Sequence, residues 1–66
     1  MLRLREIRER GGLSLRRLAA ESGVGVATLA RLEAGEYDPR LSTLRKLAKA
    51  LRVSVPTLLG EGKKGG

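Results

Sequence analysis

The sequence predicts an all-α fold, a compact domain of five helices in which the second and third form a helix-turn-helix. Apolar residues recur at intervals of three and four, the period of a helix with one buried face, and no segment alternates like a strand. Glycine or proline separates the apolar segments, which predicts short turns. The chain has 66 residues, and local helical contacts suit so small a core better than a sheet does.

The first predicted helix covers residues 2–10, with Leu4 and Ile7 on its inner side. Gly11 and Gly12 end this helix, because glycine adopts the left-handed conformation without a Cβ clash. The outer side of the helix carries arginines, which we expect to lie in solvent.

The second predicted helix covers residues 15–21 and is joined to the third by a tight turn. Ser14 is its expected N-cap, since a serine hydroxyl can accept a hydrogen bond from an amide of the first turn. Gly23 is expected to end the helix in a left-handed conformation. The inner residues of this helix and of the turn are Leu18, Ala19 and Val24.

The third predicted helix covers residues 26–34. An advance of about 100° per residue places Leu29 and Leu32 on one face, with Ala27, Ala30 and Arg31 on the other. Two short helices joined by such a turn are typical of a helix-turn-helix, whose second helix usually lies in the DNA major groove.

Two further helices complete the predicted domain. Pro39 disfavours helix at the residue before it, so the chain extends there and a fourth helix follows over residues 41–51. Ser54 is the expected cap of a fifth helix over residues 55–59, where proline is tolerated in the first turn. The inner residues of the fourth helix are Leu41, Leu44, Leu47, Ala48 and Leu51, and its other side carries Arg45, Lys49 and Arg52.

The charge of the chain indicates a polyanionic partner. Lysine and arginine number 14 against 7 acidic residues, a net charge of +7, and the pI is about 11.2. We expect residues 1–59 to form one domain and residues 60–66 a flexible basic tail.

Missing residue types disfavour other classes of function. Cysteine and histidine are absent, which removes disulfides, thiolate metal sites and the commonest general base. We therefore expect no enzyme activity, no metal, no cofactor and no small-molecule ligand. No apolar run approaches the roughly 20 residues that cross a bilayer, and no signal peptide is visible. We expect a cytoplasmic protein without a membrane partner.

A series of residues follows one order along the chain: Leu18-Ala19, Gly23-Val24, Thr28-Leu29, Arg31-Leu32-Glu33, Gly35, Pro39, Leu41, Thr43-Leu44, Lys46, Ala48-Lys49-Ala50-Leu51 and Val53-Ser54. This series, within residues 13–59, resembles the helix-turn-helix domain of the phage repressors, the lambda Cro and CI-like or XRE-type family. The first helix fits the same pattern. The resemblance implies a lambda-repressor-like fold and a bacterial or phage-like, nucleoid-associated transcription regulator, usually a repressor.

The resemblance implies that the third helix is the recognition helix. The residues it places at base edges are Val26, Ala27, Thr28 and Arg31. Arg31 can donate two hydrogen bonds to guanine O6 and N7, while short apolar side chains suit thymine methyl groups. Amides at the starts of the second and fourth helices favour anions. The expected phosphate contacts are Leu15, Arg16, Arg17, Tyr37, Arg40, Leu41 and Ser42.

In this family, the positions of Arg8 and Glu33 form a buried ion pair between the first and third helices. Both residues fall beside the apolar stripe of their helices, so we expect the pair to hold the recognition helix. The resemblance also implies a homodimer on double-stranded DNA. We place its surface at Val55, Leu58 and Leu59.

The sequence departs from the family pattern near the expected interface. Leu15 stands where glutamine is common, and Glu36 and Asp38 bring negative charge into a loop that normally approaches phosphate. Two functions therefore stay open. One is a sequence-specific DNA-binding regulator, and the other is a protein-interaction or antitoxin-like module with secondary DNA binding. Single-stranded nucleic acid is disfavoured because Tyr37 is the only aromatic residue.

Overall fold

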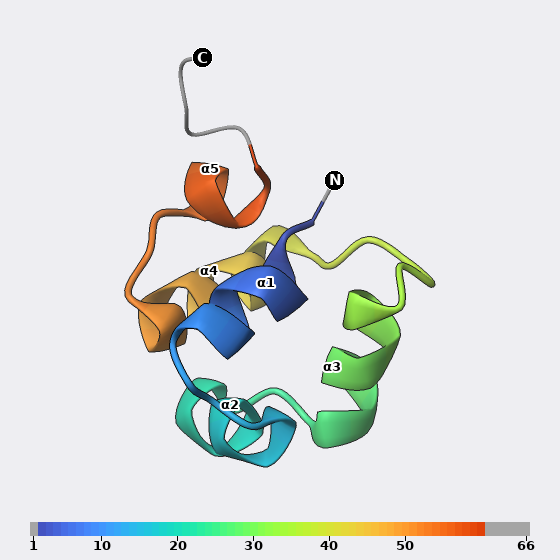
Figure 1. Cartoon of the computed structure of the whole chain (residues 1–66). Helices are drawn as coiled ribbons and strands as arrows, with labels where there is room; N and C mark the ends of the chain where they lie inside the picture. Colours follow the sequence, from blue (N-terminus) through green and yellow to red (C-terminus); the bar gives the residue numbers. More distant parts are fainter. Residues whose placement is uncertain (1, 61–66) are drawn as a thin grey trace.

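The computed structural model describes residues 2–60, which form five α-helices around one core (Figure 1). In chain order these are α1 (Leu4–Arg10), α2 (Leu15–Ser22), α3 (Val26–Glu33), α4 (Leu41–Leu51) and α5 (Val55–Leu58). No strand occurs among residues 2–60, so the predicted all-α class is confirmed. Each helix begins and ends within two residues of its predicted boundary.

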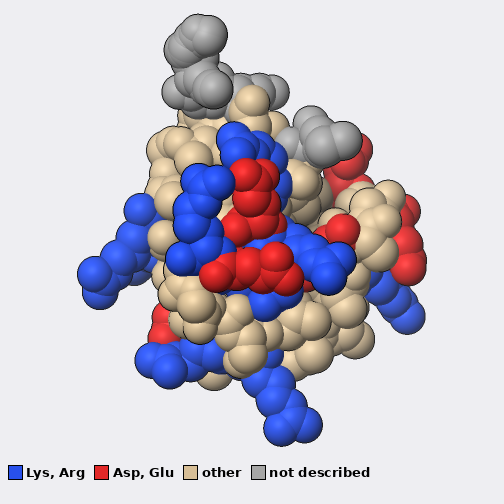
Figure 2. Space-filling model, viewed as in Figure 1, with Lys and Arg blue, Asp and Glu red and all other residues tan. Residues whose placement is uncertain are grey.

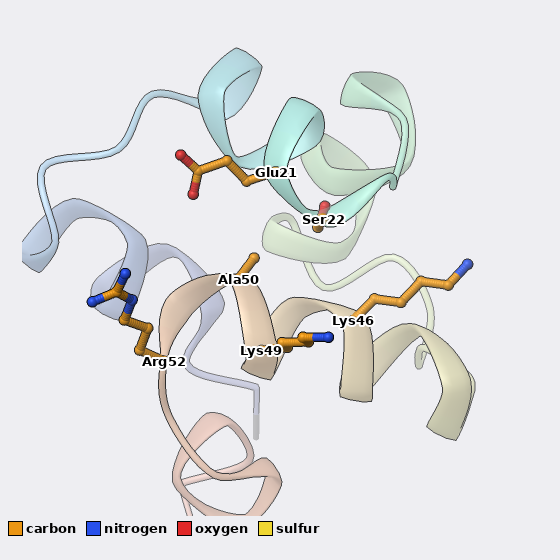
Figure 3. A pocket seen from close by; sticks show the side chains of 6 residues that line it. All are labelled: Glu21, Ser22, Lys46, Lys49, Ala50 and Arg52. Carbon is orange, nitrogen blue, oxygen red and sulfur yellow. The ribbon is translucent and has the colours of Figure 1, made fainter.

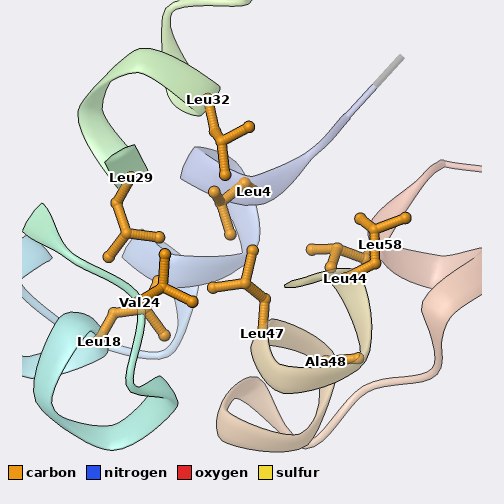
Figure 4. Close-up of a cluster of buried hydrophobic side chains, with 9 residues drawn as sticks. All are labelled: Leu4, Leu18, Val24, Leu29, Leu32, Leu44, Leu47, Ala48 and Leu58. Atoms are coloured by element: carbon orange, nitrogen blue, oxygen red, sulfur yellow. The ribbon is translucent and has the colours of Figure 1, made fainter. Parts of the chain in front are cut away.

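Leucines from every helix meet in a single hydrophobic core (Figure 4). The buried residues of this core are Leu4, Leu18, Val24, Leu29, Leu32, Leu44, Leu47, Ala48 and Leu58. Helix α2 packs against both α3 and α4, and α4 also packs against α5. Because each fully buried leucine contributes roughly 1.5–3 kcal/mol, this core fixes the position of α3.

Local hydrogen bonds hold the turn between α2 and α3. The Ser14 hydroxyl accepts the N–H of Arg17 at 3.0 Å, which is the predicted N-cap of α2. Gly23 ends α2 with a φ of +79°, the left-handed conformation predicted for it. The Ser22 hydroxyl accepts the N–H of Val24 at 3.1 Å, so a polar side chain stabilises the turn.

Two expectations about the helices are wrong. Helix α1 begins at Leu4 rather than at residue 2, because the N–H of Arg3 donates to the Leu58 carbonyl at 2.8 Å and ties that segment to α5. Leu41 is 55% exposed rather than buried. It lies in the first turn of α4, about 60° around the axis from Leu44, at the margin of the buried stripe.

The C-terminal end differs from expectation in one further respect. Leu58 is 0% exposed and belongs to the core, so it is not available for the expected dimer surface, whereas Val55 and Leu59 are half-buried. Of the expected tail, residues 61–66 lie outside the described residues. None of the helices in residues 2–60 has both the length and the hydrophobicity that crossing a membrane requires.

Candidate nucleic-acid interface

The side of α3 that faces away from the core is open to solvent. Val26 is 43% exposed, Ala27 and Arg31 are also exposed, and Thr28 is half-buried. Arg31 forms no ion pair with any carboxylate of residues 2–60. Within these residues, no carboxylate offsets the charge of its guanidinium or occupies its hydrogen-bond donors.

A bidentate ion pair ties α3 to α1 two residues beyond Arg31. Nε of Arg8 donates to Oε2 of Glu33 at 2.6 Å, and Nη2 donates to Oε1 at 3.1 Å. Nη1 of Arg8 also donates to the Leu13 carbonyl at 2.7 Å, which ties in the segment before α2. The two charged side chains are only 11% and 8% exposed. The hydrogen bonds to Glu33 raise the pKa of Arg8, which favours the charged form of this buried guanidinium.

The start of α2 lies beside the outer face of α3. A hollow of about 270 Å³ is lined by Leu15 of α2 together with Ala30 and Ala34. Arg5 of α1 lines the same hollow, which places one more cation near α3. The sequence predicts Arg5 only as a solvent-exposed residue of the first helix, because a separation of about 25 residues from Ala30 leaves no local signal of contact.

The first turn of α2 offers amides and one arginine without a carboxylate partner. The N–H of Leu18 makes the first helical hydrogen bond of α2, so the N–H groups of Leu15 and Arg16 precede that ladder. Arg16 is exposed and forms no ion pair within residues 2–60. Nε of Arg17, by contrast, lies 2.6 Å from a Glu21 carboxylate oxygen. Of the two α2 arginines that are expected to contact phosphate, Arg16 is therefore better placed than Arg17.

The start of α4 flanks α3 at a second hollow of about 240 Å³, whose lining includes Thr28, Tyr37 and Arg40. Tyr37 is 46% exposed, and Arg40, Leu41 and Ser42 are exposed as well. Arg40 is the N-cap of α4, and no side chain caps this helix. The amides of its first turn therefore remain available to an anion.

The loop between α3 and α4 carries the two acidic residues that depart from the family pattern. Glu36 and Asp38 are both exposed, and neither forms an ion pair among the described residues. Asp38 lines the same hollow as Thr28 and Arg40. Negative charge thus lies beside the cations that are expected to approach phosphate.

Helix α1 presents a different kind of surface. Figure 2 shows acidic and basic side chains interleaved across the front of the molecule. Arg3 and Arg10 share the carboxylate of Glu6, with nitrogen–oxygen distances of 2.6 Å and 3.0 Å, and Arg5 lies 3.3 Å from Glu9. Within residues 2–60, no group of three acidic or other metal-ligating side chains is placed to hold a metal ion.

Comparisons with known proteins agree with this geometry. A family model described as helix-turn-helix matches residues 4–58. The chain is 39% identical over 62 residues to the HTH-type transcriptional regulator PuuR of Escherichia coli, which covers 94% of this chain and 34% of that protein. It is 40% identical over 57 residues to the HTH-type transcriptional regulator DdrOP3 of Deinococcus deserti, with 86% and 44% covered.

A third relative, the HTH-type transcriptional repressor RghR of Bacillus subtilis, is 39% identical over 57 residues, which cover 85% of this chain and 42% of the relative. The chain thus spans less than half the length of these relatives. The family model covers all five helices, and the order of the helices and the turn after α2 match the pattern found in the sequence. The chain belongs to the XRE-type helix-turn-helix family.

Proposed function

We propose that this chain binds double-stranded DNA in a sequence-specific manner and regulates transcription, as a repressor, by placing α3 in the major groove. The observation that carries the proposal is the exposed position of Arg31 on a firmly held helix. Arg31 projects from the exposed side of α3 and has no carboxylate partner among residues 2–60, and it lies two residues from the bidentate Arg8–Glu33 pair that fixes the helix. A charged side chain on a rigidly held helix is what base recognition needs.

Each residue on the outer side of α3 has a distinct role in this proposal. Arg31 donates two hydrogen bonds to guanine O6 and N7, a contact worth about 1–3 kcal/mol of discrimination. Val26 and Ala27 are short and apolar, so they contact thymine methyl groups and allow close approach. Thr28 has a hydroxyl that can donate to a base or a phosphate.

Phosphates on both sides of the groove are held by the helix ends that flank α3. On one side, the amides of Leu15 and Arg16 and the side chain of Arg16 supply the contact. On the other, Arg40 and the uncapped start of α4 supply it, and the exposed Tyr37 adds a hydroxyl donor. These contacts fix the register of the protein on the duplex without selecting a sequence.

The names of the relatives support this function, since all three are described as HTH-type transcriptional regulators or repressors. We propose that the chain acts without catalysis and without a small-molecule ligand. We also propose that it binds as a homodimer, so that two copies of α3 meet half-sites about 34 Å apart.

Selection from a pool of random duplexes tests the proposal. The chain should enrich one motif, and the enriched duplex should bind more tightly than a shuffled sequence of the same composition. Gel filtration and a titration of that duplex measure the number of chains bound. Enrichment of no motif over several rounds would contradict sequence-specific binding.

A second candidate function rests on Glu36 and Asp38. Exposed carboxylates beside the expected DNA face repel phosphate, and they suit a basic segment of a protein partner. On this alternative, the domain is an interaction or antitoxin-like module that binds DNA weakly. The double variant Glu36→Gln/Asp38→Asn distinguishes the two candidate functions. If DNA is the partner, the change should strengthen duplex binding. If a basic protein segment is the partner, the change should weaken the binding of that protein.

A further inference from the structure

Among residues 2–60, more than half of the cations that lack a carboxylate partner lie outside the interface described above. Within residues 2–60, the lysines and arginines that form no ion pair are Arg16, Arg31, Arg40, Arg45, Lys46, Lys49 and Arg52. The first three surround or belong to α3. The other four form a surface that we call the basic ridge: Arg45, Lys46, Lys49 and Arg52.

The basic ridge faces away from the core. At about 100° per residue, Arg45, Lys46 and Lys49 lie on the side of α4 opposite Leu44 and Leu47. All four residues of the ridge are exposed. From its first to its last residue the ridge extends about 10 Å along the helix axis. The ridge is therefore a series of exposed cations along the outer side of α4.

A hollow of about 480 Å³ lies between the ridge and the end of α2. Figure 3 shows Lys46 and Arg52 at its two ends, with Glu21 and Ser22 on the opposite wall. The carboxylate in this wall does not neutralise the ridge, because Glu21 is held by Arg17 at 2.6 Å. The hollow is thus bordered by cations that have no partner within the described residues.

The composition of the ridge is unfavourable for the free domain. Lys46 and Lys49 are three residues apart and Arg45 and Lys49 four apart, spacings at which like charges destabilise a helix. Arg52 has a φ of +59°, a left-handed conformation in which a side chain is strained and glycine is not. The helix dipole favours cations at Lys49 and Arg52, but not at the two earlier positions. An anionic partner would relieve the repulsion.

We propose that the basic ridge binds the phosphate backbone of double-stranded DNA outside the base pairs that α3 contacts. This inference rests on the proposed function and extends it. The hollow is lined by Ser22, the last residue of α2, so it reaches the turn that leads into the recognition helix at Val26. A length of about 10 Å of duplex carries roughly three phosphates on each strand, so the four cations face several of them at once. The backbone belongs either to a flank of the same duplex or to a second duplex.

The test is the salt dependence of binding to a random-sequence duplex of 40 base pairs, which requires no knowledge of the operator. Replacement of Lys46 or Lys49 by Gln should each reduce the slope of log K against log salt by about 0.9. When both lysines are replaced, a four-fold rise in salt concentration should reduce the affinity of the variant about twelve-fold less than it reduces the affinity of the wild type. Arg3→Gln is the matched control, since it removes one charge that Glu6 already neutralises, and its slope should equal that of the wild type.

Two arms distinguish the source of the backbone. In the first, a single 40-base-pair duplex is titrated, and a changed slope for Lys46→Gln/Lys49→Gln assigns the ridge to the same duplex. In the second, protein on an immobilised duplex captures a second labelled duplex, and loss of capture with an unchanged slope assigns the ridge to that second duplex. Wild-type behaviour of the double variant in both arms overturns the proposal. If the double variant in that case no longer captured polyglutamate, the ridge would be assigned to an acidic protein instead.

Arg52→Gly adds a test in which two measurements move in opposite directions. The variant should unfold at a higher temperature, because glycine relieves the left-handed strain, and yet its salt slope should fall. An unchanged slope would count against a role of Arg52 in the ridge. A wild-type chain that shows steep salt dependence but no sequence preference would contradict the proposed function and leave the ridge intact. Sequence preference together with wild-type salt slopes and wild-type second-duplex capture in the ridge variants would do the reverse.

Discussion

The arginines of α1 and the arginines around α3 carry the same charge in opposite surroundings. In α1 and the residue before it, Arg3, Arg5, Arg8 and Arg10 all contact a carboxylate at 3.3 Å or less. The arginines around α3 contact none among residues 2–60; they are Arg16, Arg31 and Arg40. The net charge of a basic chain is therefore a poor measure of the charge that a polyanion meets, because paired cations are largely neutralised.

Burial divides the α1 arginines further. The Arg8–Glu33 pair is almost excluded from solvent, whereas the pairs of Arg3, Arg5 and Arg10 lie at the surface. Loss of one partner of a buried pair leaves an uncompensated charge, but loss of one partner of an exposed pair leaves a charge in water. We therefore expect the same type of contact to be structural in one case and nearly neutral in the other.

The largest effect is expected for Glu33→Ala. The change strands the buried guanidinium of Arg8 and should lower the free energy of unfolding by about 3–5 kcal/mol, measured by urea denaturation. Glu21→Ala is the matched control, because it removes an exposed partner of Arg17 and should cost about 0.5 kcal/mol or less. Equal losses for the two variants would contradict the distinction between buried and exposed pairs.

The next effect concerns binding rather than stability. Arg31→Ala should weaken binding to the selected duplex by about 1–3 kcal/mol, because a bidentate contact to guanine is lost. Its thermal unfolding should match that of the wild type, since Arg31 is exposed and forms no ion pair within the described residues. Undiminished preference for the selected duplex over a shuffled one would rule out Arg31 as a base contact.

The features that the sequence predicted well are those fixed by neighbouring residues. The helix boundaries follow from apolar period, and the cap at Ser14 and the left-handed Gly23 follow from local backbone chemistry. Leu41 was misplaced because periodicity indicates a helix face but not where the packing partner ends. The Arg17–Glu21 pair has a spacing of four residues, which is a local signal in the sequence that Arg17 is less available to phosphate than Arg16.

Contacts between distant segments cannot be predicted from neighbouring residues. The proximity of Arg8 and Glu33, 25 residues apart, was expected only because the chain resembles a family with that pair. No family resemblance predicts that Arg5 and Ala30 line the same hollow, and only the structure shows it. Surface chemistry such as the unpaired ridge on α4 likewise requires knowledge of which charges meet, and composition does not supply it.

A smaller effect is expected when the flanking arginines are changed. Arg16→Gln and Arg40→Gln should each reduce the slope of log K against log salt by about 0.9, because each releases one phosphate contact. The preference for the selected duplex over a shuffled one should stay constant, since phosphate contacts do not select a sequence. Arg17→Gln is the matched control. Its salt slope should change less, because Arg17 already forms an ion pair with Glu21. A change in preference for Arg16→Gln would place that residue at a base instead.

The smallest effect concerns the exposed pairs of α1 and depends on pH. A hydrogen bond from Arg3 lowers the pKa of Glu6 below its ordinary value of 4.5. A carboxyl whose pKa is lower in the folded state stabilises that state above the unfolded pKa, and the gain is lost as pH falls through the folded pKa. The unfolding temperature of the wild type should therefore exceed that of Glu6→Gln slightly at pH 7 and equal it below the folded pKa. A difference that persisted at pH 2 would arise from packing rather than from charge, and no difference at pH 7 would mean that these pairs neutralise α1 without stabilising it.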